Sequence, residues 1–317
     1  MRIDYLRVSV TDRCNLRCIY CDPMADCGFI KRSEILRFEE IHRIVGLFAQ
    51  CGINKVRLTG GEPLVRKNIV QLVWELAAIA GIEGLALTTN GVFLEPVAAE
   101  LKAAGLSRVN ISVDSMEREN YKRITGFDFL QKVMKGIRKA IEVGLMPVKI
   151  NTVVLRGISE QDIVGLAQLS MEMPVAVRFI EYCPTSKSPK LGSFFVPNSE
   201  VRKSIESKFG PLAATVMGNA NGPAVYFKIK GGAGTVGFIS GRTTVFCHLC
   251  NRLRLTSDGK VRPCLYSAHH YDLKELIRAG AADETVMALL EKIIAEKHKY
   301  TRLNSSAVQF SMRNVGG

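Results

Sequence analysis

Residues 3–21 read Ile-Asp-Tyr-Leu-Arg-Val-Ser-Val-Thr-Asp-Arg-Cys-Asn-Leu-Arg-Cys-Ile-Tyr-Cys. The aliphatic and β-branched residues within 3–10 predict a short strand. The loop that follows spaces three cysteines as Cys14-x3-Cys18-x2-Cys21. Three thiolates are one fewer than a closed zinc site or a fully ligated four-iron cluster requires, so a metal centre held here keeps one position open. An open position indicates a site that does chemistry.

Strand and helix patterns alternate over the first two-thirds of the chain. Five further strands are predicted, each short, rich in Val, Ile and Leu, and bounded by Gly, Asn or Pro, at residues 54–59, 84–89, 108–113, 147–154 and 175–181. Helical periodicity fills the intervals, at residues 38–48, 67–80, 95–104, 130–143, 160–170 and 198–208. Six successive βα units predict a parallel sheet with helices outside it, as a doubly wound sheet, a barrel or a partial barrel.

Polar motifs follow the predicted strands and favour the barrel. They are the first cysteine triplet, Thr59–Pro63 (Thr-Gly-Gly-Glu-Pro), Thr88–Gly91 (Thr-Thr-Asn-Gly) and Ser112–Ser115 (Ser-Val-Asp-Ser). In barrels, chemistry gathers at the C-terminal ends of the strands. We therefore predict an α/β fold, with a partial (β/α)6 TIM-like barrel over residues 1–184 and a smaller C-terminal β-containing extension over residues 185–317.

A second set of three cysteines lies in the extension. Cys247 and Cys250 form a knuckle, and Cys264 follows after thirteen intervening residues, which a hairpin would bring back. His248 lies between the first two, where its side chain would point away from a shared metal, so we expect a surface or packing role. From spacing alone, each triplet is compatible with zinc completed by a distant side chain or with an iron–sulfur cluster.

Two arginines beside this triplet are candidate ligands for an anion. Arg252 and Arg254 are one strand period apart, so their side chains emerge on one face. Such a pair suits a clamp for phosphates or a purine ring, although two solvated arginines on an edge strand would show the same pattern. Residues 224–240 predict a hairpin before them, and helices near 272–279 and 283–298 follow.

The composition restricts the class of protein and partner. The net charge is +13, from 43 basic and 30 acidic residues, which indicates an anionic partner. One Trp, eight Tyr and no long run of like charge disfavour an extended nucleic-acid channel and favour a compact pocket for a polyanionic small molecule. We expect no secretory signal and no membrane span, and therefore a cytoplasmic protein whose clustered cysteines bind metal.

The first triplet, Tyr20 before its last cysteine, and Gly60-Gly61-Glu62-Pro63 after the second strand resemble the radical S-adenosylmethionine (SAM) superfamily. The resemblance implies a partial barrel of the radical SAM type and a four-iron cluster whose fourth iron is chelated by SAM. Reductive cleavage of SAM then gives a 5′-deoxyadenosyl radical. The implied SAM contacts are Tyr20, Gly61, Ser112 and Cys183. Cys183 stands where relatives usually carry Met, which leaves a backbone contact open to it.

Within that superfamily, both triplets, the stretch Cys-Asn-Arg-Leu-Arg-Leu-Thr from Cys250 and the final Gly316-Gly317 resemble the MoaA family, the GTP 3′,8-cyclases of molybdenum cofactor biosynthesis. The resemblance implies a second four-iron cluster, on Cys247, Cys250 and Cys264, whose open iron binds guanine, and a C-terminal tail that reaches into the active site. The implied GTP contacts are Arg7, Arg57, Thr88, Lys149, Arg252, Leu253 and Arg254, and the implied catalytic residues are Arg178, Arg252 and Arg254.

The reaction implied is removal of hydrogen from the ribose C3′ of GTP, attack of that carbon on guanine C8, and reduction to the cyclic dihydroguanosine triphosphate. The expected partners are GTP, a low-potential reductant, the next enzyme of the pathway and a second copy in a homodimer, with no membrane and no nucleic acid. Two alternatives stay open: a radical SAM enzyme with an auxiliary cluster that acts on RNA or peptide, and a non-catalytic zinc or iron–sulfur protein.

Overall fold

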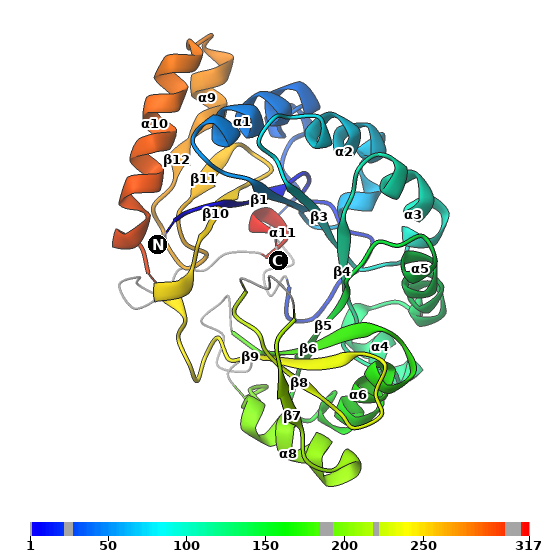
Figure 1. Cartoon of the computed structure of the whole chain (residues 1–317). Helices are drawn as coiled ribbons and strands as arrows, with labels where there is room; N and C mark the ends of the chain where they lie inside the picture. The colour runs from blue at the N-terminus through cyan, green and yellow to red at the C-terminus, as the bar shows by residue number, and fades with distance from the viewer. Residues whose placement is uncertain (1, 22–27, 184–192, 218–221, 302–311, 317) are drawn as a thin grey trace.

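A computed structural model describes residues 2–21, 28–183, 193–217, 222–301 and 312–316. One twelve-stranded sheet runs through it in the order β12-β11-β10-β1-β2-β3-β4-β5-β6-β9-β8-β7. The eight strands from β10 to β9 run parallel to one another and curve around a central space (Figure 1). The sheet ends at β12 and β7 and does not close, so the fold is a partial barrel of the TIM type, as predicted.

The six predicted strands are confirmed as β1 (Tyr5–Ser9), β2 (Lys55–Thr59), β3 (Gly84–Thr89), β4 (Arg108–Ser112), β5 (Val148–Val154) and β6 (Val175–Glu181). The helices that cover them are α1 (Phe38–Gln50), α2 (Ile69–Ala77), α3 (Leu94–Ala103), α4 (Arg118–Thr125), α5 (Leu130–Glu142), α6 (Ile163–Glu172) and α8 (Asn198–Phe209). All were predicted except α4. It buries only Tyr121, Ile124 and Thr125, which is too few apolar positions to produce a helical pattern in the sequence.

The C-terminal elements extend both ends of the barrel sheet. They are β7 (Ala213–Thr215), β8 (Val225–Lys228), β9 (Thr235–Ile239), β10 (Arg252–Leu255), β11 (Lys260–Arg262), β12 (Tyr271–Asp272), α9 (Leu273–Arg278), α10 (Asp283–Glu296) and α11 (Met312–Val315). The predicted hairpin is β8–β9, and the two predicted helices are α9 and α10. Strand β9 pairs with β6, and β10 pairs with β1. Hydrogen bonds thus cross the boundary expected at residue 184, and the division into two domains stays a prediction.

Strand alternation separates the apolar core from the interior of the barrel. On β1, Leu6 and Val8 are fully buried in the core, whereas Tyr5 and Arg7 line the central space. Helix α1 covers the outer face with four completely buried apolar side chains at helical spacing, Ile41, Ile44, Val45 and Phe48. Because successive side chains of a strand point to opposite faces, an apolar outer face leaves the inner face free for polar residues. No described helix is both long and apolar enough to cross a membrane.

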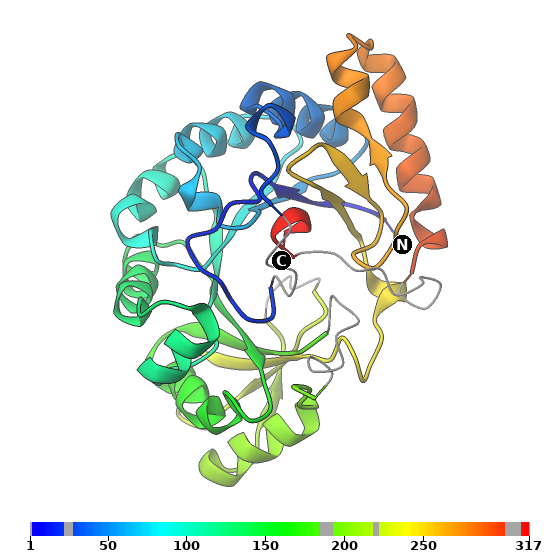
Figure 2. The same ribbon diagram turned by 180° about the vertical axis from the view of Figure 1, so that it is seen from behind.

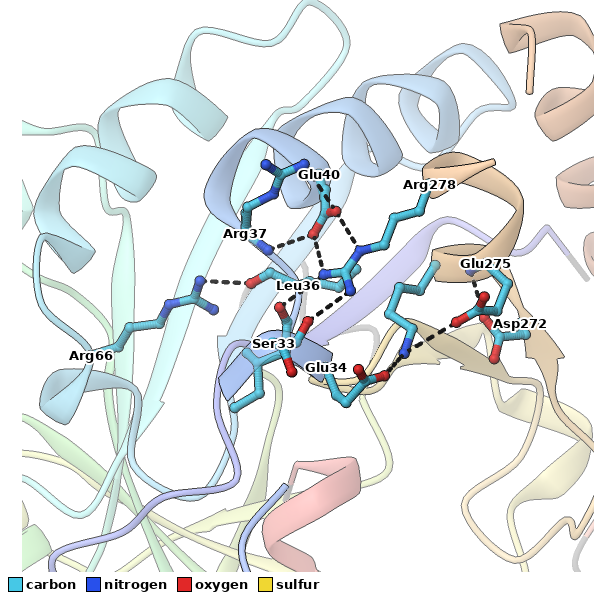
Figure 3. Close-up of polar contacts among 11 residues, drawn as sticks. Ser33, Glu34, Leu36, Arg37, Glu40, Arg66, Asp272, Glu275 and Arg278 are labelled. Atoms are coloured by element: carbon cyan, nitrogen blue, oxygen red, sulfur yellow. Dashed lines mark hydrogen bonds and ion pairs between the residues drawn. The ribbon is translucent and has the colours of Figure 1, made fainter. Parts of the chain in front are cut away.

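An ionic contact joins α9 to α1 across the outside of the barrel (Figure 3). Arg278 donates from Nε and Nη2 to the two carboxylate oxygens of Glu40, at 2.8 and 3.1 Å, and from Nη1 to the carbonyl of Ser33 at 2.7 Å. The backbone N–H of Arg37 also donates to Glu40, at 2.7 Å. Burial alone would raise the pKa of Glu40, but these hydrogen bonds outweigh it and hold the pKa at about 2. Glu40 is therefore ionised and anchors the extension to the barrel.

Replacing Glu40 by glutamine is expected to lower the free energy of unfolding by about 2 kcal/mol at pH 7, because Arg278 loses its charged partner. The pKa of Glu40 is lower in the folded chain than in the unfolded one, so its contribution is complete above about pH 4.5 and fades as the pH falls towards 2. Urea unfolding of both proteins at pH 7 and pH 3 measures this. Glu39→Gln, an exposed neighbour, is the control. An E40Q deficit that is equal at both pH values would contradict the assignment.

Candidate active site

One cavity of about 1220 Å³ occupies the barrel interior. Residues at the C-terminal ends of the strands and in the loops after them line one part of it, and residues at the strand starts line another. Both cysteine triplets contribute to its wall, and so does each other predicted site residue except Leu253. The structure therefore brings together two triplets that are more than 220 positions apart in sequence.

The first triplet lies in a loop that is anchored to α4. The backbone N–H of Arg17 donates to the carbonyl of Thr125 at 2.9 Å, and that of Ile19 donates to Ile124 at 3.0 Å. The thiol of Cys14 accepts from the N–H of Leu16 at 3.4 Å. Burial raises the pKa of Cys14 to about 11. A thiol in such a place becomes a thiolate when a positively charged metal centre binds it.

The donor chemistry of each triplet fits an iron–sulfur cluster. All six cysteines are half-buried and free of disulfides. Among the residues that the structure describes, no three side chains of metal-binding types converge on one ion position. A four-iron cluster requires a different arrangement, in which each thiolate reaches its own iron.

The Gly60-Gly61 segment packs directly on the chain that leads to Cys14. The N–H of Gly61 donates to the carbonyl of Thr11 at 2.7 Å, and a Cβ on Gly61 would lie 2.3 Å from the carbonyl oxygen of Arg13. Gly60 has φ +150°, and its Cβ would lie 2.5 Å from the carbonyl oxygen of Thr11. Only glycine allows two backbones to approach so closely.

Glu62 fixes this segment to the next strand. Its carboxylate accepts from the Thr89 hydroxyl at 2.7 Å, from the Asn90 N–H at 2.6 Å and from the Leu64 N–H at 3.0 Å. Burial raises its pKa to about 7. Asn90 in turn reaches the Cys14 sulfur at 3.8 Å and donates to Asn15 at 2.8 Å. The sequence indicated polar motifs at both strand ends but not this contact between them.

The four predicted SAM contacts lie in the part of the cavity that is lined by the C-terminal ends of the strands and the loops after them. Tyr20 follows Cys18 in the first loop, Ser112 ends β4, and Cys183 lies just after β6. The Tyr20 hydroxyl donates to the buried carboxylate of Asp114, which also accepts from the Val153 N–H at 2.8 Å. Asp114 belongs to a predicted motif but had no predicted role. Burial raises its pKa to about 6.

The second triplet lies beside β10 and β11. The N–H of Cys250 donates to the carbonyl of Cys247 at 3.1 Å in a short turn, and Cys264 follows β11. Burial would raise the pKa of Cys250, but the charges of Arg252 and Lys297 outweigh it and lower the pKa to about 7. His248 is exposed and does not line the cavity, in agreement with its expected surface role.

A row of cations crosses the inner face of the sheet. In the strand register Arg254 on β10 is level with Arg7 on β1, which is level with Arg57 on β2. Among the residues that the structure describes, the buried Nε atoms of Arg7, Arg57 and Arg178 find no hydrogen-bond partner, and neither does the buried hydroxyl of Thr88. Burial lowers the pKa of Arg7 to about 9 and that of Arg57 to about 10, and neighbouring arginines add to both shifts. Such a concentration of partly unsatisfied positive charge fits a polyanionic ligand.

Two further predicted contacts behave differently. Lys149 on β5 lines the cavity, and burial, with the charges of Arg178 and Arg57, lowers its pKa to about 7. Leu253 is fully buried in the hydrophobic core. Because it alternates with Arg252 and Arg254 on β10, its side chain points away from the cavity and only its backbone is available for a contact.

The C-terminal segment lies in the central opening of the barrel (Figure 2). The N–H of Met312 donates to the carbonyl of Cys21 at 3.1 Å, and the carbonyl of Gly316 accepts from Arg254 at 2.5 Å. Gly316 has φ +70°, and a Cβ there would lie 2.2 Å from a methyl carbon of Thr59. This segment therefore connects the first cysteine loop to the arginine row. Gly317 lies outside the described residues.

These features define the class of protein. The model of the radical SAM superfamily matches residues 8–170, and the chain belongs to that superfamily. Membership implies a four-iron cluster and SAM. SuiB of Streptococcus suis bound to S-adenosylmethionine has the same fold, with a TM-score of 0.64 and 14% identity over 92% of this chain and 68% of that one. A model described as Molybdenum Cofactor Synthesis C matches residues 175–303.

Curated relatives identify the family within this class. The chain is 45% identical to the GTP 3′,8-cyclase of Pelotomaculum thermopropionicum, over 99% of this chain and 98% of the relative. It is 46% identical to the GTP 3′,8-cyclase of Moorella thermoacetica, over 100% and 98%. The chain belongs to the GTP 3′,8-cyclase family.

Proposed function

We propose that this protein converts GTP to (8S)-3′,8-cyclo-7,8-dihydroguanosine 5′-triphosphate, the first step of molybdenum cofactor biosynthesis. The observation that carries the proposal is that two cysteine triplets and a row of cations, two of them with an unpaired Nε among the described residues, line one cavity. Cys14, Cys18 and Cys21 would hold the first cluster, and SAM bound there would supply the radical chemistry that removes hydrogen from the ribose. The chain itself supplies position, charge and exclusion of water.

The site residues are assigned as follows in this proposal. Cys14, Cys18 and Cys21 hold the first cluster, and Tyr20, Gly61, Ser112 and the backbone of Cys183 contact SAM. Cys247, Cys250 and Cys264 hold a second four-iron cluster that binds guanine. The residues that contact GTP are Arg7, Arg57, Thr88, Lys149, Arg252, Leu253 through its backbone, and Arg254, with Arg178, Arg252 and Arg254 in catalysis.

The residues proposed to bind SAM and those proposed to bind the phosphates of GTP lie in different parts of the cavity. The first triplet and the Gly60-Gly61 segment lie at the C-terminal ends of the strands, whereas Arg7 and Arg57 lie lower on the inner face. In the proposed complex the phosphates lie on the arginines and the guanine lies on the second triplet, with the sugar between the two triplets. Arg178 on β6 donates from Nη2 to the side-chain oxygen of Asn151 on β5 at 2.5 Å, and this hydrogen bond orients its guanidinium.

Lys149 makes GTP binding depend on pH. Its lowered pKa of about 7 means that it loses its charge as the pH rises through neutrality, whereas a bound phosphate favours the charged form. The Kd for GTP is expected to rise above about pH 7 by up to about tenfold per pH unit. Calorimetric titration from pH 6 to pH 9 measures this. Lys149→Met is expected to bind GTP weakly with a flatter profile, and a variant profile as steep as that of the wild type would contradict the role.

The deciding experiment is an anaerobic assay of the reconstituted protein with SAM, reductant and GTP, scored for 5′-deoxyadenosine and cyclised nucleotide. Iron, sulfide and zinc are measured on the same sample. Two four-iron clusters and a cyclised product support the proposal. Stoichiometric zinc without iron would favour a non-catalytic protein. SAM cleavage that needs RNA or peptide instead of GTP would favour a radical SAM enzyme that acts on one of those substrates.

The proposal also includes partners that the assay tests only indirectly. They are a low-potential reductant for the first cluster, transfer of the product to the next enzyme, and a homodimer. A cytoplasmic location, predicted from the clustered cysteines, belongs to the same proposal. Analytical ultracentrifugation of the reconstituted protein tests the homodimer.

A further inference from the structure

Arg108 is a cation in the cavity wall to which neither the sequence analysis nor the family resemblance gives a role. It is the first residue of β4 and lies on the same face of that strand as Ser112. It lines the cavity and is half-exposed. In the part of the chain that the structure describes, Arg108 forms no hydrogen bond and no ion pair. Its guanidinium therefore has its full set of donors available to a ligand.

Gly84 leaves space beside this guanidinium. Gly84 begins β3, between β2 and β4, and a Cβ placed on it would lie 3.7 Å from Arg108 Nη1 and 3.6 Å from Lys55 Cγ. The side chains of Arg108 and Lys55 thus come from the two flanking strands and approach the same point over Gly84. Lys55 is paired with Asp4 at 2.7 Å, so Arg108 carries the uncompensated charge of the two. A side chain longer than a methyl group at position 84 would fill this space.

Arg108 also extends the row of cations on the inner face of the sheet. The register runs from Arg254 through Arg7 and Arg57 to Ala86, and Ala86 is level with Arg108. The charge of Arg108 contributes to the lowered pKa values of Arg57 and Lys149. These repulsions are relieved when an anion binds among the cations, so Arg108 favours an anionic ligand over an empty site.

Arg108 has the same register level as Arg57 and Arg254, so its greater solvent exposure indicates which part of the ligand it meets. Arg57 and Arg254 are buried, whereas Arg108 and Lys55 lie at strand starts and are partly exposed. In a nucleotide with its sugar between the two triplets, the phosphate chain runs outward, and its last phosphate lies nearest the rim. We propose that Arg108 binds the terminal phosphate of the nucleotide and makes the site select a triphosphate over a monophosphate. This inference rests on the proposed function, because it takes GTP as the ligand.

The test is calorimetric titration of the reconstituted protein with GTP, GDP and GMP, without SAM or reductant so that no turnover occurs. Arg108→Gln removes the charge and keeps most of the side-chain length. Its affinity for GTP is expected to fall about 10- to 100-fold, the effect of losing a charge-assisted hydrogen bond, while its affinity for GMP changes less than about twofold. Arg108→Lys is expected to keep part of the preference, since it keeps the charge and loses the bidentate geometry.

Arg138→Gln is the matched control, because Arg138 is an exposed arginine on α5. It is expected to bind all three nucleotides like the wild type. The inference is overturned if Arg108→Gln keeps the wild-type ratio of GTP to GMP affinity, whether both affinities stay unchanged or both fall by the same factor. The proposed function is judged separately by cyclised product from the wild type: a wild type that selects triphosphates without forming product keeps the inference and loses the function.

Discussion

Cleavage of SAM is expected to fall by at least about 100-fold when Gly61 is replaced by alanine, because an added Cβ would lie 2.3 Å from the carbonyl oxygen of Arg13. The two backbones must then separate by at least about 0.7 Å, the difference between the 2.3 Å contact and the 3.0 Å below which real Cβ contacts essentially never fall. That shift moves the segment that is proposed to contact SAM relative to the loop that is proposed to hold the cluster. The measurement is 5′-deoxyadenosine formation under anaerobic conditions with excess reductant.

Gly46→Ala is the matched control for this substitution. Gly46 lies within α1, and nothing in the protein lies within 4 Å of a Cβ added there. The control is expected to fold and cleave SAM like the wild type, with a small gain in helix stability. Iron content of Gly61→Ala separates a misplaced SAM site from a lost cluster. Cleavage within twofold of the wild-type rate would show that the close approach at Gly61 is not needed.

Replacing Cys250 by alanine is expected to abolish GTP cyclisation while leaving the first cluster in place. Cys250 is one of the three proposed ligands of the second cluster, and although burial disfavours its thiolate, the charges of Arg252 and Lys297 outweigh burial. The variant is expected to hold roughly half of the wild-type iron, since in the proposed assignment each triplet holds one four-iron cluster. Reductive cleavage of SAM persists, uncoupled from any nucleotide product.

Cys51→Ala serves as the control for this loss. Cys51 follows α1, packs against the hydrophobic core and does not line the cavity. It is expected to keep the full iron content and full cyclisation activity. Iron and sulfide analysis with electron paramagnetic resonance of the reduced proteins distinguishes the two cysteines. Full iron and full cyclisation in Cys250→Ala would remove the second cluster from the proposal.

Local sequence predicts most of the elements of this fold. Each of the six predicted strands is found within about two residues of its predicted limits, because the pattern of apolar residues reports burial on the sheet directly. The helix α4 escapes the pattern because its mostly polar residues bury only Tyr121, Ile124 and Thr125. It is nevertheless the support on which the first cysteine loop is hydrogen-bonded.

The candidate site likewise has features that local sequence predicts and contacts that only the tertiary structure shows. The cysteine spacings and the Gly60-Gly61 pair are visible in sequence, because short loops place their side chains by local geometry. The contacts of Asp114 with Tyr20 and of Asn90 with Cys14 join residues 76 or more positions apart. No local pattern reports such pairs, and the same holds for the space that Gly84 leaves beside Arg108.

Residues 3–21 alone determined a strand and a loop with three cysteines, and this spacing predicts a metal centre with an open position. The tertiary structure decided that the second triplet shares the same cavity, because β10 pairs in parallel with β1 and sets Arg254 level with Arg7. It also decided that the C-terminal segment returns to that cavity, where Arg254 holds Gly316. Periodicity reports which face of an element is buried, but which distant elements meet depends on packing of the whole chain.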